Sequence, residues 1–194
     1  RSWDGTPNIR PWNKSSPPPG AGIRAIPRGI NWVLHSMIRI KPHHFMDIIK
    51  LYGSGLNEFI PDQVYKHDFY LVANKVINNH KVELTLTDGE DDICRPCKFN
   101  KEGSCTDSIS HIPNITSKDY YNQVLDHRLM DMMNLSFDKI YIASELCNIM
   151  YKNRDAIISI WEEESDPITQ RRYELFCAGS LRYSSATSKR YGQE

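Results

Sequence analysis

The pattern of apolar and polar residues becomes regular at Met37. Residues 37–41 alternate between the two types, as a short strand does, and Pro42 ends the alternation. Residues 43–52 follow as a helix that ends at Gly53. The chain therefore opens its folded part with a strand and a helix, and two histidines lie at the start of that helix.

The next two segments predict a second helix and a second strand. A helix is expected from about Asp62 to Asn78, since its apolar residues approximate one face. Residues 82–86 alternate again, and Asp88 and Gly89 end this strand in a turn. The strand delivers the chain into a cysteine-rich loop.

Three more helices are expected in the second half of the chain. They cover residues 119–133, with Ser117 as a cap, 145 to about 161, with Ser144 as a cap, and 169–183. Together these elements predict an α+β fold: a mostly helical single domain with a small two- or three-stranded sheet and a cysteine-rich metal-binding loop.

Domain organisation follows from the change at Met37. Residues 1–36 are rich in proline and glycine and have neither helical nor strand periodicity. We interpret them as a tail that is vector-derived or comes from upstream sequence. Residues 37–185 are expected to form the iron–sulfur-binding domain, and residues 186–194 a flexible C-terminal tail.

Composition limits the classes of function. The 194 residues include 24 basic and 24 acidic side chains, so the formal net charge of +0 argues against general nucleic-acid binding. No apolar run has the length that spans a bilayer. Free cysteines favour the reducing cytoplasm, and a small molecule is the expected partner. The sequence leaves the oligomeric state open.

Candidate chemistry is concentrated in one loop. Cys94, Cys97 and Cys105 have the spacing C-x2-C-x7-C, in which Pro96 stiffens the first turn and Gly103 lets the chain double back. This spacing favours an iron–sulfur cluster, which tolerates three clustered cysteines. Zinc is the alternative, with His111 as a fourth ligand. A disulfide framework fits less well, because the number of cysteines is odd.

Two motifs resemble a known family. The chain is similar to domain-of-unknown-function family number twelve eighty-four, which is found in bacteria and archaea. The similarity lies in residues 38–47, which include Pro42-His43-His44, in residues 88–97, which end in Asp-Asp-Ile-Cys-x-x-Cys, and in Cys105. The resemblance covers roughly residues 37–183. It implies an iron–sulfur protein and a natural start at Met37, and it says little about substrate.

One departure from the family pattern bears on function. Members often carry a cysteine three residues after the His-His pair, where this chain has Asp47. The resemblance then implies a [4Fe-4S] cluster with three cysteine ligands and one iron that is open or held by Asp47. Cys147 and Cys177 are further candidates for the fourth ligand, although Cys147 reads better as a buried small hydrophobe.

Two functions follow. In the first, the chain is a non-redox iron–sulfur enzyme, a lyase or hydrolase, whose open iron acts as a Lewis acid while Asp47, His43 and His44 move protons. A desulfidase that removes sulfur from a thiocarbonyl compound or a thiolated nucleobase would suit such a soft metal site. In the second, the chain is a structural zinc or electron-transfer module without catalysis.

Overall fold

The structure, a computed structural model, describes residues 37–191, with side chains up to residue 186. Our interpretation of residues 1–36 as a tail therefore lies outside the described residues. At the other end, helix α6 (Asp166–Tyr191) continues beyond residue 185. Residues 186–191 are therefore helical in the structure, and residues 192–194 of the expected C-terminal tail lie outside the described residues.

A mixed sheet of three short strands forms one layer. Its order is β1 (Ile38–Ile40), β2 (Glu83–Leu86) and β5 (Ile140–Ile142), with β1 parallel to β2 and β2 antiparallel to β5. Alternate side chains of β1 are buried, and they pair in register with the buried residues Leu84 and Leu86. The apolar alternation that predicted these two strands therefore reflects their buried face.

A separate two-stranded hairpin folds the cysteine loop. It pairs β3 (Asn100–Lys101) with β4 (Ser104–Cys105) in antiparallel register. Glu102 and Gly103 connect the strands with φ of 53° and 88°, a left-handed conformation that favours glycine. The tight turn brings Cys105 back along the strand that follows Cys97.

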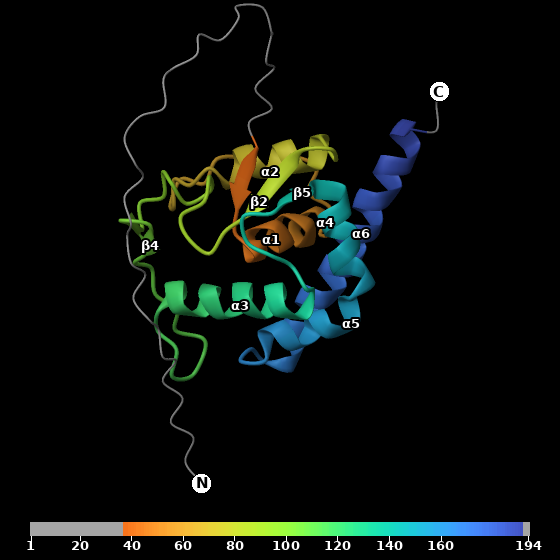
Figure 1. The fold of residues 1–194 in the computed structure, drawn as a ribbon. Coiled ribbons are helices and arrows are strands. Elements are labelled where there is room, and N and C mark those ends of the chain that lie inside the picture. The colour runs from red at the N-terminus through yellow and green to blue at the C-terminus, as the bar shows by residue number, and fades with distance from the viewer. Residues whose placement is uncertain (1–36, 192–194) are drawn as a thin grey trace, which may run out of the picture. The chain divides into compact units, whose positions relative to one another are not determined.

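Helices surround α1 on several sides (Figure 1). The helices are α1 (Pro42–Gly53), α2 (Phe69–Asn78), α3 (Lys118–Met132), α4 (Ala143–Lys152), the short α5 (Arg154–Ile157), the 3-10 helix η1 (Ile158–Trp161) and α6. Helix α1 packs against α2, α3 and α6. The approach to α6 is close because Gly53 and Gly179 meet there without side chains.

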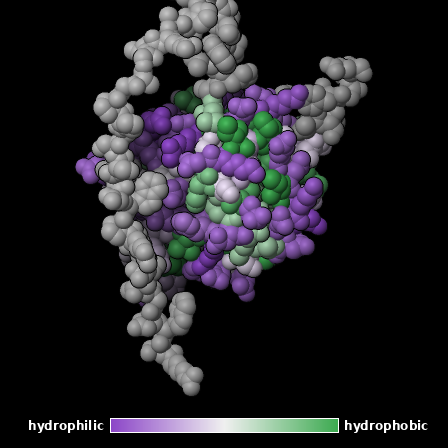
Figure 2. Space-filling model, viewed as in Figure 1, coloured by the Kyte–Doolittle hydropathy of each residue, from purple (hydrophilic) through white to green (hydrophobic). Residues whose placement is uncertain are grey.

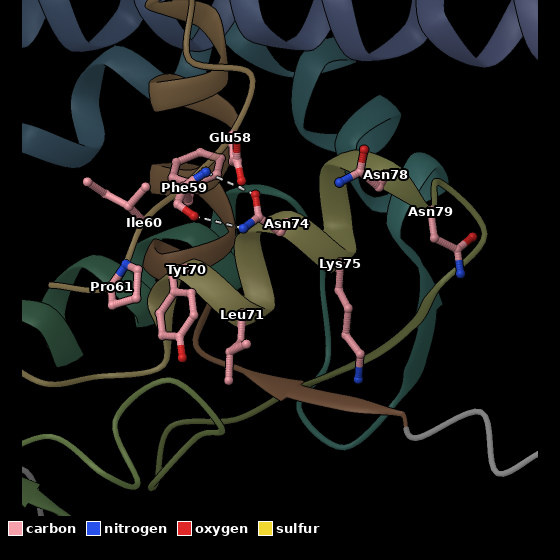
Figure 3. A pocket seen from close by; sticks show the side chains of 10 residues that line it. All are labelled: Glu58, Phe59, Ile60, Pro61, Tyr70, Leu71, Asn74, Lys75, Asn78 and Asn79. Carbon is pink, nitrogen blue, oxygen red and sulfur yellow. Dashed lines mark hydrogen bonds between the residues drawn. The ribbon is translucent and has the colours of Figure 1, made fainter.

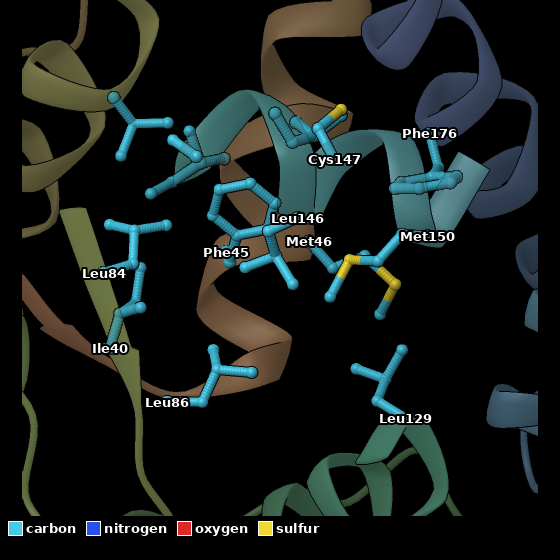
Figure 4. Close-up of a cluster of buried hydrophobic side chains, with 14 of the residues drawn as sticks. Ile40, Phe45, Met46, Leu84, Leu86, Leu129, Leu146, Cys147, Met150 and Phe176 are labelled. Carbon is cyan, nitrogen blue, oxygen red and sulfur yellow. The ribbon is translucent and has the colours of Figure 1, made fainter. Parts of the chain in front are cut away.

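The core lies between these helices and the sheet (Figure 4). Its fully buried side chains include Ile40 and Leu84 of the sheet, Phe45 of α1, Leu129 of α3 and Phe176 of α6. On the face that Figure 2 shows, polar side chains surround smaller apolar areas. None of the helices within residues 37–191 has the length and apolar character needed to cross a membrane.

The α+β class and its small sheet are confirmed, and the structure corrects the limits of three helices, of which α6 extends beyond the predicted residues 169–183 at both ends. Helix α2 begins at Phe69, because the Asp62 carboxylate accepts hydrogen bonds from the N–H groups of Val64 and Tyr65 and forms a turn instead. Lys66 then has φ of 58°, which a right-handed helix cannot contain.

The helix predicted for residues 145–161 is also divided. Its first part is α4, which begins at Ala143, so Ser144 lies inside the helix. Asn153 ends α4 by donating a side-chain hydrogen bond to Ile149 O, and α5 and η1 follow. Strand β5 immediately before α4 was not predicted. Ser117, by contrast, is confirmed as the cap of α3, where its Oγ accepts a hydrogen bond from Tyr120 N–H.

Candidate metal centre and adjoining pocket

The loop after β2 lies along β1. Thr87 donates its N–H to Ile40 O at 3.1 Å, and Asp92 donates to Arg39 O at 3.0 Å. The Asp92 carboxylate accepts the N–H of Arg39 in return. These bonds fix Asp91 beside the start of α1, so the cysteine loop begins next to the two histidines.

Asp91 joins the loop to the helix. Its carboxylate is fully buried and accepts hydrogen bonds from Lys41 N–H at 3.0 Å, His44 Nδ1 at 2.7 Å and Cys94 N–H at 2.8 Å. Burial opposes its ionisation, but the charge of His44 and these hydrogen bonds outweigh burial and hold the pKa of Asp91 far below its usual range. Asp91 is therefore an ionised anchor for both segments.

His44, Asp91 and Cys94 form the group that could hold a metal ion. One ligand atom from each lies within 4.8 Å of those of the other two. Nδ1 of His44 is bonded to Asp91, so Nε2 is the ring nitrogen left to bind a metal, and Asp91 would then orient the ring rather than bind the same ion. Burial and the Asp91 charge raise the pKa of the Cys94 thiol, so a cation would be needed to stabilise its thiolate.

Cys97 and Cys105 follow in the same loop. Cys97 N–H donates to Cys94 O at 2.9 Å, which closes the turn between the two cysteines. Cys105 N–H donates to Asp119 of α3 at 2.9 Å. All three thiols are partly exposed and free of disulfides. Only Cys94 belongs to the close group with His44, although the ligands of a cluster bind separate irons and need not reach one ion.

His43 points to a different partner. Its N–H donates to the buried Asp126 of α3 at 2.7 Å, and its Nδ1 lies 2.9 and 2.8 Å from the two Asp126 oxygens. Burial lowers the pKa of His43, but the charge of Asp126 and this hydrogen bond outweigh it and raise the pKa. Nε2 is buried and has no hydrogen-bond partner among residues 37–186. The rings of His43 and His44 are 4.2 Å apart.

A pocket of ≈ 160 Å³ adjoins His43. Helices α1, α3 and α6 and the 3-10 helix η1 contribute to its lining, which includes His43, Asp47, Tyr121, Trp161, Glu164 and Arg172. The buried carboxylate of Glu164 organises the far side, because it accepts hydrogen bonds from Tyr121 OH and Arg172. The polar side chains on this side of the pocket are thus hydrogen-bonded to one another.

The other predicted site residues lie in different surroundings. Asp47 lines the pocket and pairs with Lys50 at 2.6 Å, while His111 lies against Glu164 at 3.3 Å and belongs to the pocket. Cys147 is fully buried in the core (Figure 4). Cys177 is half-buried on α6, where the Tyr173 hydroxyl and the α5 residues around Arg154 surround it.

Sequence reasoning missed three residues of this region. Asp126, Glu164 and Arg172 lie 83, 121 and 129 positions after His43, so no local motif connects them. A polar residue within an otherwise apolar helical face was the available signal for Asp126, since a buried carboxylate requires a partner. Asp91 and Asp92, which come just before the first cysteine, each accept a hydrogen bond from the backbone of the β1 region.

A larger groove of ≈ 600 Å³ lies beside α2 (Figure 3). Phe59 and Asn74 are joined there by two hydrogen bonds, from Phe59 N–H to Oδ1 at 3.0 Å and from Nδ2 to Phe59 O at 2.8 Å. The described residues that line this groove include no cysteine or histidine. It therefore offers none of the chemistry found near α1.

No family model, curated protein or solved structure matches the chain in the three comparisons that we made.

Proposed function

We propose that the protein holds an iron–sulfur cluster through Cys94, Cys97 and Cys105 and is a non-redox enzyme that acts on a small molecule. One observation carries the proposal: Asp91 binds both His44 and Cys94, so the cysteine loop is fixed against a helix start that presents two histidines. A loop that only linked two elements would need no such buried anchor.

The residues present fit this cofactor by their chemistry. Three free, partly exposed thiols in one loop supply the soft ligands that iron–sulfur clusters use. Cys147 is enclosed by the core, and Cys177 lies next to α5. These positions do not favour either residue as the fourth thiolate ligand of the cluster. When bound, a cluster with three thiolate ligands supplies a Lewis acid at its remaining iron.

The chain's own residues would hold and move protons. Asp126 fixes His43 through Nδ1, so Nε2 is the atom that accepts or donates a proton toward the pocket. Asp47 lines the same pocket and interacts electrostatically with His43. The buried surroundings exclude water from this proton path except through the pocket.

Desulfuration of a thiocarbonyl compound is the reaction we propose. A water oxygen forms a new bond to the thiocarbonyl carbon, the carbon–sulfur bond breaks, and the sulfur leaves with two protons as hydrogen sulfide. Carbon keeps its oxidation state, so the step needs no external oxidant or reductant. His43 would take the proton from water and return it to the departing sulfur.

Anaerobic purification followed by absorbance, iron and sulfide analysis tests the cofactor. We expect a coloured protein that loses its iron when Cys97 is changed to serine, because a hydroxyl is a poor ligand for the cluster. Cys177→Ser is the matched control and should keep the iron. Sulfide release from 2-thiouracil then tests the reaction, and His43→Gln should slow it roughly a hundredfold.

Structural zinc is the alternative that one observation favours. His44 lies close to Cys94 and could supply a nitrogen and a sulfur ligand to one zinc ion, and Cys97 and Cys105 would have to move toward that ion to complete a common structural set of three cysteines and one histidine. A colourless protein that contains stoichiometric zinc after anaerobic preparation, and releases no sulfide from 2-thiouracil, would establish this reading and reject the enzyme.

A further inference from the structure

His43 presents one buried polar atom that the fold leaves unsatisfied. Both Asp126 oxygens face Nδ1, and Nε2, at the opposite side of the ring, is buried without a hydrogen-bond partner in the described part of the chain. Leaving such a buried atom unpaired is unfavourable, because it has lost its hydrogen bonds to water. Because His43 also lines the pocket, a ligand there can supply the missing partner.

The size of the pocket limits that ligand. Its volume is ≈ 160 Å³, and an engineered cavity of about 150 Å³ in another protein takes up one benzene molecule. A single six-membered ring therefore fits, whereas a nucleotide or a peptide does not. The buried Trp161 and the apolar side chains of Met46 and Leu125 contribute apolar surface to the lining for such a ring.

Charge pairing limits the ligand further. Each fully charged residue of the lining already has a partner within the protein: Asp47 with Lys50, Lys118 with Asp107, and Glu164 with Arg172. No described lining cation is left over to bind an anion, and no described lining carboxylate to bind a cation. An uncharged ligand is thus the one that enters without breaking an ion pair.

We propose that this pocket binds an uncharged, hydrogen-bonding single-ring heterocycle, with one polar ring atom paired to His43 Nε2. This ligand class would be the substrate class of the proposed enzyme, so the role of the pocket in catalysis rests on the proposed function. A ring with a thiocarbonyl group in place of a carbonyl group is also uncharged and is larger only by the difference between one sulfur and one oxygen atom.

Calorimetric titration of the full chain with uracil, benzoate and benzene tests the class. Uracil should bind, and benzoate and benzene should bind at least tenfold more weakly. Asn122→Trp fills the pocket from α3, where Asn122 is half-buried, and should weaken uracil binding at least tenfold. Asp131→Trp places the same side chain on an exposed position of α3 outside the pocket and should leave binding unchanged.

Nitrogen-15 NMR of the imidazole rings tests the contact in the wild-type protein. Uracil should shift the His43 Nε2 resonance. Three results would overturn the proposal that this pocket binds an uncharged heterocycle. They are absence of that shift at saturating uracil, tighter binding of benzoate or benzene, and equal uracil binding by the Asn122→Trp variant. Iron measured on the same sample separates the two proposals. A protein that contains iron but does not bind uracil rejects the proposed ligand of the pocket and leaves the proposed cluster intact. A protein that binds uracil but contains no iron rejects the cluster and leaves the ligand proposal intact.

Discussion

At the scale of single residues, Asp91 is the most consequential side chain. It satisfies three donors while fully buried: Lys41 N–H between β1 and α1, His44 in α1 and Cys94 N–H in the cysteine loop. Asp91→Asn removes the charge and turns an NH2 group toward these donors, so we expect a loss of about 2–4 kcal/mol in the free energy of unfolding. Metal content should fall as well, because the loop loses its anchor.

Urea unfolding and metal analysis check this prediction. Asp92→Asn is the matched control, since Asp92 is partly exposed and its carboxylate accepts a single backbone bond, from Arg39. Asp92→Asn should lower the free energy of unfolding by less than half as much as Asp91→Asn does. Equal losses in the two variants would show that the loop is held by its backbone pairing rather than by the buried charge.

The sequence could predict those parts of the site whose residues lie close together along the chain, but not the contacts between residues far apart in the sequence. The cysteine spacing and the His-His pair are local patterns, so they could be recognised without a structure. Which histidine meets the loop could not, because adjacent helix positions face different directions and the partners, Asp91 and Asp126, are 47 and 83 residues away. The pocket escaped prediction for the same reason, since its walls come from distant helices.

At the scale of elements, the contact between α1 and α6 is the tightest. A Cβ added to Gly179 would lie 1.9 Å from Ile49 O, and one added to Gly53 would lie 2.0 Å from Leu175 O. Gly179→Ala must therefore separate the helices, and we expect a cost of about 3 kcal/mol or more in thermal or urea unfolding. Gly89→Ala, whose new Cβ meets nothing closer than 3.7 Å, is the control and should change stability little.

The elements that sequence patterns predicted best are those with one regular apolar face. Strands β1 and β2 and most of α1 follow from periodicity, because burial on one side selects the residues, whereas the start of α3 follows from its Ser117 cap. Strand β5 and the break at Asn153 did not follow. Strand β5 is apolar at all of its positions, Ile140, Tyr141 and Ile142, so it shows no alternation, and Asn153 ends α4 through a hydrogen bond that a helical wheel does not reveal.

At the scale of the whole molecule, Arg128 connects α3 to the segment after η1 and so closes one side of the domain. Its guanidinium donates to both Glu163 oxygens, at 2.8 and 2.6 Å, and to Ile160 O at 2.9 Å. The hydrogen bond from Arg128 lowers the pKa of Glu163 below its ordinary 4.5. A carboxyl with a lowered pKa stabilises the fold above its ordinary pKa and loses that effect as pH falls through the lowered value.

Glu163→Gln should therefore lower the free energy of unfolding by about 0.5–1 kcal/mol at pH 7, the scale of a partly exposed ion pair. The difference from the wild type should shrink as pH falls below 4.5, because the wild-type carboxyl then takes up a proton and weakens the pairing. Urea unfolding at pH 7 and pH 3 measures both values. Glu162→Gln, at a carboxylate that is 64% exposed, is the control and should cost less at pH 7. A deficit of Glu163→Gln that stays the same at both pH values would show that Arg128 holds α3 through its bond to Ile160 O rather than through the charge of Glu163.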